Sequence, residues 1–285
     1  MKSRTLEQPF VPTRFCAEVG RLAVRSLYQE LVLYPKPGLV SLIDNGSHQD
    51  MDASTFMRSL FSLRGYFVAV TAAGMRRASF DELRTLGIAA EARMMRATGG
   101  VNTHRGAIFC LGMLCAAVGA GYAQRDVFSP AAIRANVLAH WGEALGRHSL
   151  MQAATSHGGA REEAALGFPA IFEIALPQLE KSQRAGIAWH ETKIDTLFLL
   201  MSHIHDSNVY RRGGLSGAEI VKDFGRQFLA AGGTSRADWM RHAIAVHDDF
   251  VRLGLSPGGA ADLLAASCFA YQVCSVRNAS PTPPL

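Results

Sequence analysis

Charge is scarce in this sequence, and no segment is strongly basic. Asp, Glu, Lys and Arg make up 19% of the 285 residues, below the roughly 25% usual for globular proteins. Hydrophobic residues make up 48%, so the chain can bury a sizeable core. The formal net charge of +5 is spread out, without the basic stripe of a nucleic-acid-binding protein, so no nucleic-acid partner is expected. Diffuse positive charge suits a polyanionic small substrate and equally a basic surface without a role.

Paired cysteine motifs and targeting signals are missing as well. The five cysteines form no C-x-x-C pair and lie in apolar stretches, which indicates buried thiols in a reducing compartment. The first ten residues carry charges without an apolar core, so they are not a signal peptide, and a cytoplasmic location is expected. The uncharged run 106–124 approaches the length of a membrane span. It contains four glycines and directly follows a polar motif, so it is interpreted as a buried helix, and no membrane partner is expected.

Period-2 alternation of apolar residues is also absent, whereas helix signals are frequent. Capping boxes occur at 79–82 and 216–219, and Ser-Pro pairs that start helices occur at 129–130 and 256–257. We predict an all-α, single multi-helix bundle-like domain over residues 13–278, with a loose N-terminus at 1–12 and a Pro-rich tail at 279–285. The expected helices are 14–32, 53–75, 80–97, 104–120, 130–149, 159–166, 169–184, 191–204, 217–231, 235–253 and 257–276.

Polar segments rich in Gly, Asp and His interrupt these helices, and loops of this kind often carry function. The first, residues 34–52, opens with a Pro-Lys-Pro-Gly turn that would hold Lys36 in one place. Three carboxylates (Asp44, Asp50 and Asp52), a histidine (His48) and a serine (Ser47) follow within nine residues. Such oxygens suit a hard divalent metal, and the lysine suits a triphosphate. A polar turn ending in a helix cap at Asp52 or Ser54 would explain the same composition.

The second segment, Thr-Gly-Gly-Val-Asn-Thr-His-Arg-Gly at 98–106, directly precedes an apolar helix. Glycines and free N–H groups at a helix start can cradle a phosphate, and His104 and Arg105 add donors. The segment lacks the GK[ST] of a Walker loop. A glycine helix stop followed by an Asn or Thr cap is the equal alternative.

Three further segments follow. Residues 157–169 offer Arg161 and Glu162, which would face a site or form a surface ion pair. Residues 203–214 are expected to end a helix and then form a loop with arginines and a glycine pair, suited to phosphate; a glycine-capped helix end is the alternative. Residues 255–264 place glycines at a helix start, which taken singly is an ordinary cap.

Together these segments resemble one family. The matching strings are, in order, PKPGLVS with D-x-GSH-x-DM, TGGVNTHRGAIF-x-LG, AR-x-EA-x-x-GFP, DSN, RGG and LSPGGAADLLA. Their pattern is similar to that of the triphosphoribosyl-dephospho-coenzyme A synthases, with one branch serving citrate lyase and another malonate decarboxylase. Asn208 and Ala260 depart from the expected threonine and serine without removing an ionisable group. Leu33-Tyr34 and 156–158 slightly favour the malonate decarboxylase branch.

The resemblance implies a transferase that uses ATP and 3′-dephospho-CoA. It implies attack of a ribose hydroxyl on the anomeric carbon of ATP, release of adenine, and passage of the product to a holo-acyl-carrier-protein synthase. Mg²⁺ is expected as cofactor. Metal or acid/base roles are expected for Asp44, Asp50 and Asp206, and catalytic roles also for His48 and His104. Substrate binding is expected at Lys36, Ser47, Gly99, Gly100, Asn102, Arg105, Arg161, Asn208, Arg212, Gly213 and Gly214.

Two other functions remain open at the level of sequence. The pairs His205-Asp206 and His247-Asp248 are compatible with a helical His-Asp phosphohydrolase, which would hold transition metals tightly. A helical scaffold for lyase or decarboxylase subunits is the non-enzymatic alternative, but it leaves the polar segments unexplained. The oligomeric state is not determined, and a homodimer is left open.

Overall fold

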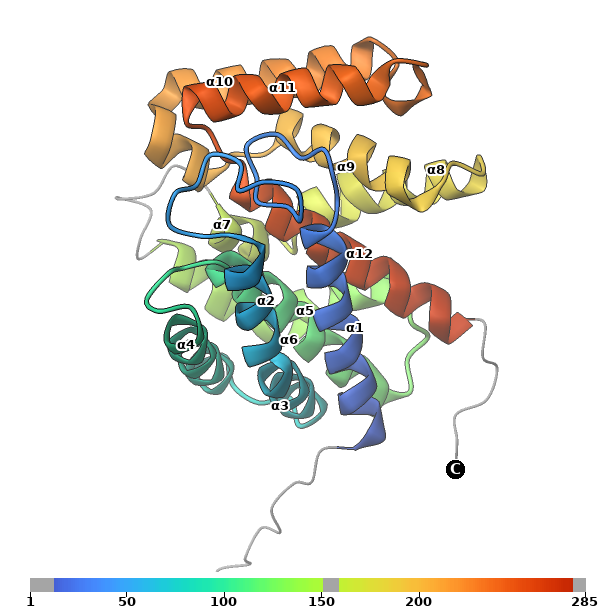
Figure 1. Ribbon diagram of the computed structural model, residues 1–285. Coiled ribbons are helices and arrows are strands. Elements are labelled where there is room, and N and C mark those ends of the chain that lie inside the picture. Colours follow the sequence, from blue (N-terminus) through green and yellow to red (C-terminus); the bar gives the residue numbers. More distant parts are fainter. Residues whose placement is uncertain (1–12, 151–158, 279–285) are drawn as a thin grey trace, which may run out of the picture.

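The computed structural model describes residues 13–150 and 159–278, and within these ranges every regular element is a helix. The predicted all-α class is therefore confirmed, whereas the predicted loose N-terminus and Pro-rich tail lie outside the described residues. Figure 1 shows the helices, which in chain order are α1 (Arg14–Leu31), α2 (Ala53–Ser62), α3 (Arg64–Met75), α4 (Phe80–Ala97), α5 (Arg105–Gln124), α6 (Pro130–Leu150), α7 (Ala160–Ala165), η1 (Ala170–Ala175), α8 (Leu176–Arg184), α9 (Trp189–His203), α10 (Ser207–Ala230), η2 (Gly233–Ser235), α11 (Trp239–Leu253) and α12 (Gly258–Asn278).

The apolar helix α5 is the centre of the packing. It contacts α3 most extensively and also α12, α6, α4, α1 and α7. In the described part of the chain it is the one helix long and apolar enough to cross a membrane. However, 78% of its apolar 18-residue stretch is buried inside the protein. Burial on all sides is typical of a core helix, so length and composition are weak evidence for a membrane span.

Glycines set the close approach of α3 and α5. A Cβ atom on Gly74 would lie 2.0 Å from the carbonyl oxygen of Ala116, and one on Gly119 would lie 2.2 Å from the carbonyl oxygen of Thr71. Only glycine permits backbones to meet at this distance. The two helices consequently form a tight pair, and α1 packs against α3 and also contacts α5.

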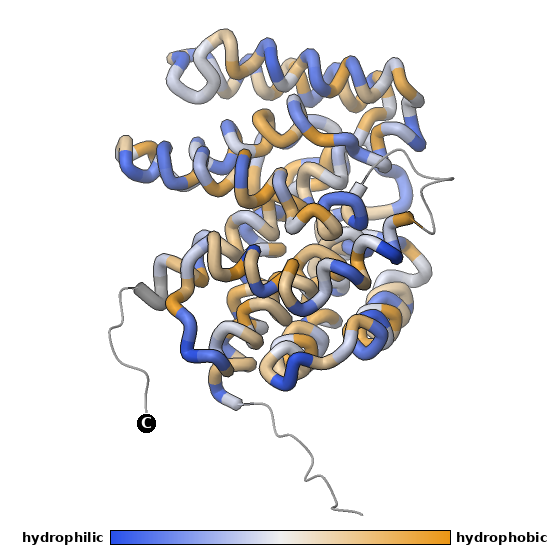
Figure 2. The backbone as a smooth tube through the Cα atoms, turned by 180° about the vertical axis from the view of Figure 1, so that it is seen from behind, coloured by the Kyte–Doolittle hydropathy of each residue, from blue (hydrophilic) through white to orange (hydrophobic). Residues whose placement is uncertain are grey.

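The helices α10 and α11 form an outer layer above α9, at the top of Figure 1. In Figure 2 both alternate between hydrophilic and hydrophobic residues along their length, as amphipathic surface helices do. The loop of residues 32–52 runs between this layer and α1. It is held there by the Ser47 hydroxyl, which donates to the carbonyl oxygens of Leu255 (2.6 Å) and Phe250 (3.1 Å).

Several predicted boundaries are wrong, and two of the differences have a clear local cause. The predicted helix 53–75 is two helices, because Leu63 leaves regular geometry (φ −89°, ψ −9°) between α2 and α3. The predicted loop through residue 214 is helical from Ser207, because the Asp206 side chain caps the backbone N–H groups of the first turn. The glycine pair leaves only a kink, at Gly214 (φ 60°, ψ −156°).

Candidate active site

A cavity of about 1350 Å³ lies between the outer helices and the core. Its wall is built from loop 32–52, the starts of α5, α10 and α12, and faces of α2, α4, α6 and α7. The fold thus gathers polar segments that are far apart in the sequence around one space. Nine of the predicted site residues line it: His48, Asp50, Asn102, His104, Arg105, Arg161, Asp206, Asn208 and Arg212.

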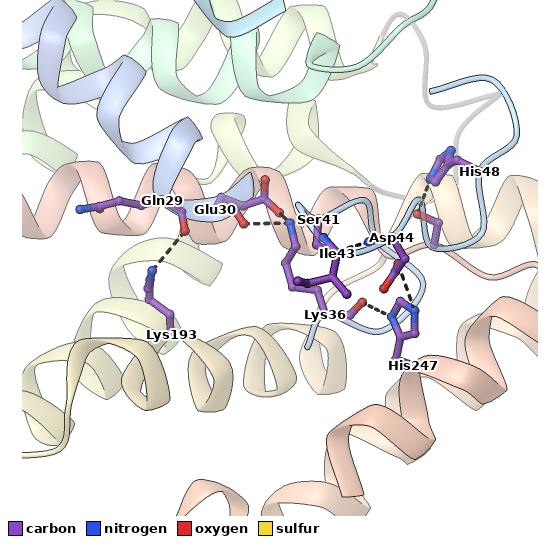
Figure 3. A network of polar contacts seen from close by, with 10 residues as sticks. Gln29, Glu30, Lys36, Ser41, Ile43, Asp44, His48, Lys193 and His247 are labelled. Atoms are coloured by element: carbon purple, nitrogen blue, oxygen red, sulfur yellow. Dashed lines mark hydrogen bonds and ion pairs between the residues drawn. The ribbon is translucent and has the colours of Figure 1, made fainter. Parts of the chain in front are cut away.

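Lys36 does not line the cavity. Its side chain is only 1% exposed, and Nζ donates to Oε1 of Glu30 (2.5 Å) and to the carbonyl oxygen of the same residue (2.8 Å). Burial lowers the pKa of Lys36, and the carboxylate of Glu30 opposes that shift. Figure 3 shows the lysine pointing to the end of α1. In this arrangement Lys36 locks the Pro-Lys-Pro-Gly turn onto α1, and Glu30 is the partner that reaches the cavity wall.

Asp44 and Ser47 also lie behind the wall. Oδ1 of Asp44 accepts from the backbone N–H of Gly46 (2.8 Å) and lies 3.2 Å from Nε2 of His247. Nδ1 of His247 contacts the carbonyl oxygen of Lys36 at 2.8 Å (Figure 3). Both ring nitrogens therefore face oxygens, and the ring ties the loop to α11. The contacts of Asp44 and Ser47 are those of loop anchors.

The predicted glycines serve the backbone rather than the cavity wall. Gly99 and Gly100 have positive φ (68° and 94°) and end α4, where the N–H of Gly100 bonds to the carbonyl oxygen of Met95 (2.7 Å). Gly213 approaches Leu255, because a Cβ there would lie 2.7 Å from its Cδ2. These are contacts of a helix stop and of helix packing.

His48 and Arg212 meet at the mouth of the cavity. Nη2 of Arg212 donates to Nδ1 of His48 (3.1 Å), and Nη1 donates to the carbonyl oxygens of Ser47 (3.1 Å) and Gly254 (3.0 Å). Because Nδ1 accepts, Nε2 carries the proton and donates to Oγ of Ser256 (2.9 Å). Burial and then Arg212 lower the pKa of His48, so the ring is neutral here and its proton is already engaged.

Asp206 sits where two helices begin. Its Oδ1 accepts from the backbone N–H groups of Asn208 (2.9 Å) and Val209 (3.3 Å), and Oδ2 accepts from that of Ala260 (3.0 Å). A Cβ on Gly259 would lie 2.9 Å from Oδ2, so this glycine makes room for the carboxylate. Burial raises the pKa of Asp206, while these backbone donors oppose the shift. The carboxylate joins the starts of α10 and α12.

The carboxylates predicted for Mg²⁺ do not form one site. Asp50 is 64% exposed near His48, Asp44 faces His247, and Asp206 caps helices. In the described part of the chain no group of three or more His, Cys, Asp or Glu side chains is placed to hold a metal ion. The arrangement fits a metal that arrives on a triphosphate, because protein Mg²⁺ sites often use one or two carboxylates plus substrate phosphates. It does not fit the ligand set of a dinuclear His-Asp phosphohydrolase.

His104 is the deepest of the predicted catalytic residues. It is 2% exposed; Nδ1 lies 2.6 Å from Oγ of Ser59, and Nε2 has no hydrogen-bond partner among the described residues. Burial, and next the cation of Lys36, lower the pKa of His104 to about 3. A neutral imidazole with one unpartnered nitrogen therefore forms part of the cavity wall.

Asp262 is a functional candidate to which sequence reasoning assigned no role. It lies on α12 and lines the cavity. Burial, then the neighbouring Glu30 and Asp206 carboxylates, raise the pKa of Asp262 well above its usual range, and the backbone N–H of Ala107 opposes this. A carboxyl group with a raised pKa holds its proton to higher pH than an ordinary aspartate, which suits it to serve as a general acid. The sequence signal that could have identified Asp262 is its place in the LSPGGAADLLA motif.

Arginines from four helices border the same space. They are Arg84 (α4), Arg105 (α5), Arg161 (α7), and Arg211 and Arg212 (α10). Arg105 forms an ion pair with Glu91 of α4, and Oδ1 of Asn102 accepts from its backbone N–H (3.1 Å). Asn208 packs beside Gly258, where a Cβ would lie 2.9 Å from Nδ2. Guanidinium groups from several directions suit a polyanion.

The sequence matches known proteins over most of its length. The family described as ATP:dephospho-CoA triphosphoribosyl transferase matches residues 16–280. The chain belongs to this family. A protein of Acinetobacter calcoaceticus named "Probable 2-(5''-triphosphoribosyl)-3'-dephosphocoenzyme-A synthase" is 43% identical, over 88% of this chain and 89% of that protein. A Klebsiella pneumoniae protein named as such a synthase is 39% identical, over 90% and 94% of the two chains. No solved structure matches.

Proposed function

We propose that the cavity binds ATP and 3′-dephospho-CoA together and that the chain transfers the triphosphoribosyl group of ATP to a ribose hydroxyl of 3′-dephospho-CoA. The volume of the cavity, about 1350 Å³, is the observation that carries this proposal. A pocket for one small molecule usually encloses about 300–1,000 Å³, so this one has room for two nucleotides. The family description names both compounds.

The bonds that change determine which groups are needed. The bond between the ribose anomeric carbon and adenine breaks, with its electron pair going to adenine, and a bond to the acceptor oxygen forms. The acceptor hydroxyl loses one proton and adenine gains one. The transition state resembles an oxocarbenium ion, which a nearby carboxylate stabilises. Asp262 is the wall residue suited to carry a proton, and the Asp206 carboxylate lies at the same end of α12.

The arginines would hold the phosphates. Arg161 and Arg211 are exposed, and Arg212 approaches from the mouth, so the triphosphate would lie on the α7–α10 side of the cavity. When bound, Mg²⁺ would neutralise charge on the triphosphate. Asp50, an exposed carboxylate of the cavity wall next to His48, would be the residue that contacts the metal.

We further propose that the product, 2′-(5″-triphosphoribosyl)-3′-dephospho-CoA, is passed to a holo-acyl-carrier-protein synthase and supplies malonate decarboxylase. Leu33-Tyr34 and the segment 156–158 support this branch over citrate lyase. A cytoplasmic location is supported by five cysteines that are all buried and free.

The test supplies purified protein with ATP, Mg²⁺ and 3′-dephospho-CoA and follows nucleobases and nucleotides by chromatography. We expect one free adenine per coupled product, and mass analysis should find all three phosphates retained. ADP, AMP or pyrophosphate without adenine would contradict the proposal and favour a phosphohydrolase. Adenine release that does not need 3′-dephospho-CoA would show that the acceptor is wrong. For the branch, the gene for this chain should lie beside genes for malonate decarboxylase subunits, whereas neighbouring citrate lyase genes would contradict that assignment.

A further inference from the structure

Two hydroxyl groups determine which nitrogen of His104 carries the proton. Oγ1 of Thr103 donates to Oγ of Ser59 (2.7 Å), and Oγ of Ser59 lies 2.6 Å from Nδ1 of His104. Ser59 is fully buried, and these are its hydroxyl's two partners. Because Oγ of Ser59 accepts the hydrogen bond from Thr103, the one remaining acceptor for the Ser59 hydroxyl proton is Nδ1 of His104.

The opposite assignment leaves a buried donor unsatisfied. If Nδ1–H donated to Ser59, the Ser59 proton would have no acceptor among the described residues, and burying such a donor without a partner is costly. The chain of hydrogen bonds therefore runs from Thr103 to Ser59 to Nδ1, which leaves the proton of the neutral ring on Nε2. Nε2 is one of the buried atoms without a partner among the described residues, and His104 is among the residues that line the cavity.

We infer that His104 presents Nε2–H as a fixed, uncharged hydrogen-bond donor to a ring nitrogen of the departing adenine, and that Ser59 and Thr103 are the positioning residues that hold this tautomer. The inference rests on the proposed function. It replaces the phosphate contact and unspecified catalytic role expected for His104 with stabilisation of the charge that develops on adenine as its bond to ribose breaks.

The surroundings favour a neutral heteroaromatic base over a phosphate. The edge of the imidazole meets the ring of Phe56, with centroids 4.9 Å apart at 71°. Its pKa of about 3 keeps the ring uncharged at neutral pH, with Lys36 as the nearby cation. Arg161, Arg211 and Arg212 lie on the α7 and α10 side of the cavity, where they would attract the phosphates.

The first experiment tests the tautomer without any activity measurement. Nitrogen NMR on the ¹⁵N-histidine-labelled protein, with His104 assigned from the His104→Gln spectrum, should show a protonated Nε2 and an accepting Nδ1. Ser59→Ala should shift the resonances toward the other tautomer. Ser62→Ala, on the same helix and outside the hydroxyl chain, should leave them unchanged. A wild-type ring protonated on Nδ1 would overturn the inference.

The second experiment identifies the acceptor with 3-deaza-ATP and 7-deaza-ATP, which lack N3 and N7 respectively, the two ring nitrogens one carbon away from the nitrogen bonded to ribose. His104→Phe should lower kcat with ATP about 100-fold, and His104→Gln, whose amide can donate, should recover part of it. With the analogue that lacks the contacted nitrogen, the kcat of His104→Phe should be close to that of wild type. The analogue has already removed one partner of the hydrogen bond, so loss of the other partner has little further effect.

Equal fold losses for ATP and both analogues would show that the donor serves neither N3 nor N7, and would overturn the inference even if the transferase activity is present. Absence of adenine release from wild type with ATP would instead reject the proposed function, and with it adenine as the acceptor. The NMR result would distinguish the two failures, because the tautomer is measured in the free protein.

Discussion

Lys36 shows how a residue of the right type can be placed out of reach of the substrate. Its burial against Glu30 makes the pair an internal link between loop 32–52 and α1. Breaking a buried ion pair by removing one partner typically costs about 3–5 kcal/mol, whereas replacing both partners by apolar groups can be nearly neutral.

We therefore expect Lys36→Met to lower the free energy of unfolding by about 3–5 kcal/mol, measured by urea denaturation. Glu30→Leu combined with Lys36→Met should recover a large part of the loss. A stable Lys36→Met protein with only a raised KM for ATP would show that Lys36 contacts phosphate after all, through a rearranged loop.

Asp262 carries the second prediction at this scale. Asp262→Asn should lower kcat about 10²- to 10⁴-fold, the usual contribution of a general acid or base, with a smaller change in KM for ATP. A loss confined to KM would assign Asp262 to binding only.

The pH dependence of stability provides an independent measurement for the same residue. Because the folded pKa of Asp262 is raised, the native state holds the proton more tightly than the unfolded state does. This contribution to stability is complete below the ordinary aspartate pKa of about 3.9 and is lost as pH rises through the folded pKa. In Asp262→Asn the unfolding free energy should fall less with rising pH over this window.

At the scale of elements, the tight pair α3 and α5 depends on glycine. Gly74→Ala places a methyl carbon 2.0 Å from the Ala116 carbonyl oxygen, so the helices must move apart, and overpacking of this kind costs about 1–3 kcal/mol. Gly65→Ala, on the same helix with nothing within 4 Å, should instead stabilise by about 0.5–1 kcal/mol. Thermal unfolding of both variants would check the prediction, and shifts of the same sign would contradict it.

Arg212 connects α10 with loop 32–52 and with the residue that ends α11. Each hydrogen bond to a charged group contributes roughly 1.5–3 kcal/mol, so Arg212→Ala should raise KM for ATP at least tenfold. Arg212→Lys should restore only part of the affinity, since a lysine cannot reproduce the planar fork. An unchanged KM in the alanine variant would remove Arg212 from the phosphate site.

For the whole molecule, the distribution of carboxylates predicts how metal is used. Activity should require Mg²⁺ and vanish in excess EDTA, because a triphosphate close to carboxylates is otherwise repelled. The melting temperature without substrate should not respond to EDTA, because the described residues form no three-ligand group. Full activity in EDTA would remove metal from the mechanism, and a lowered melting temperature would reveal a structural site.

Much of the architecture could be predicted from local signals. Capping residues and three-to-four periodicity act within a few residues, so the all-α class and most helix positions follow from the sequence. The predictions were wrong where a contact with a residue far away in the sequence determined the local structure. Asp206 starts α10 and also accepts from Ala260, 54 residues away; a reading of neighbouring glycines and arginines suggested a loop instead.

The same distinction between local signals and distant contacts applies to the candidate site. By itself the sequence determined the family, the helical class and the polar segments, because motif strings and periodicity are properties of adjacent residues. Only the tertiary structure decided which polar side chains meet. It directed Lys36 to Glu30 and Asp44 to His247, brought Arg212 to His48, and placed Asp262 at the cavity. The reason is physical: burial, hydrogen-bond pairing and the orientation of a side chain depend on groups that are remote in the chain and adjacent only in the folded protein.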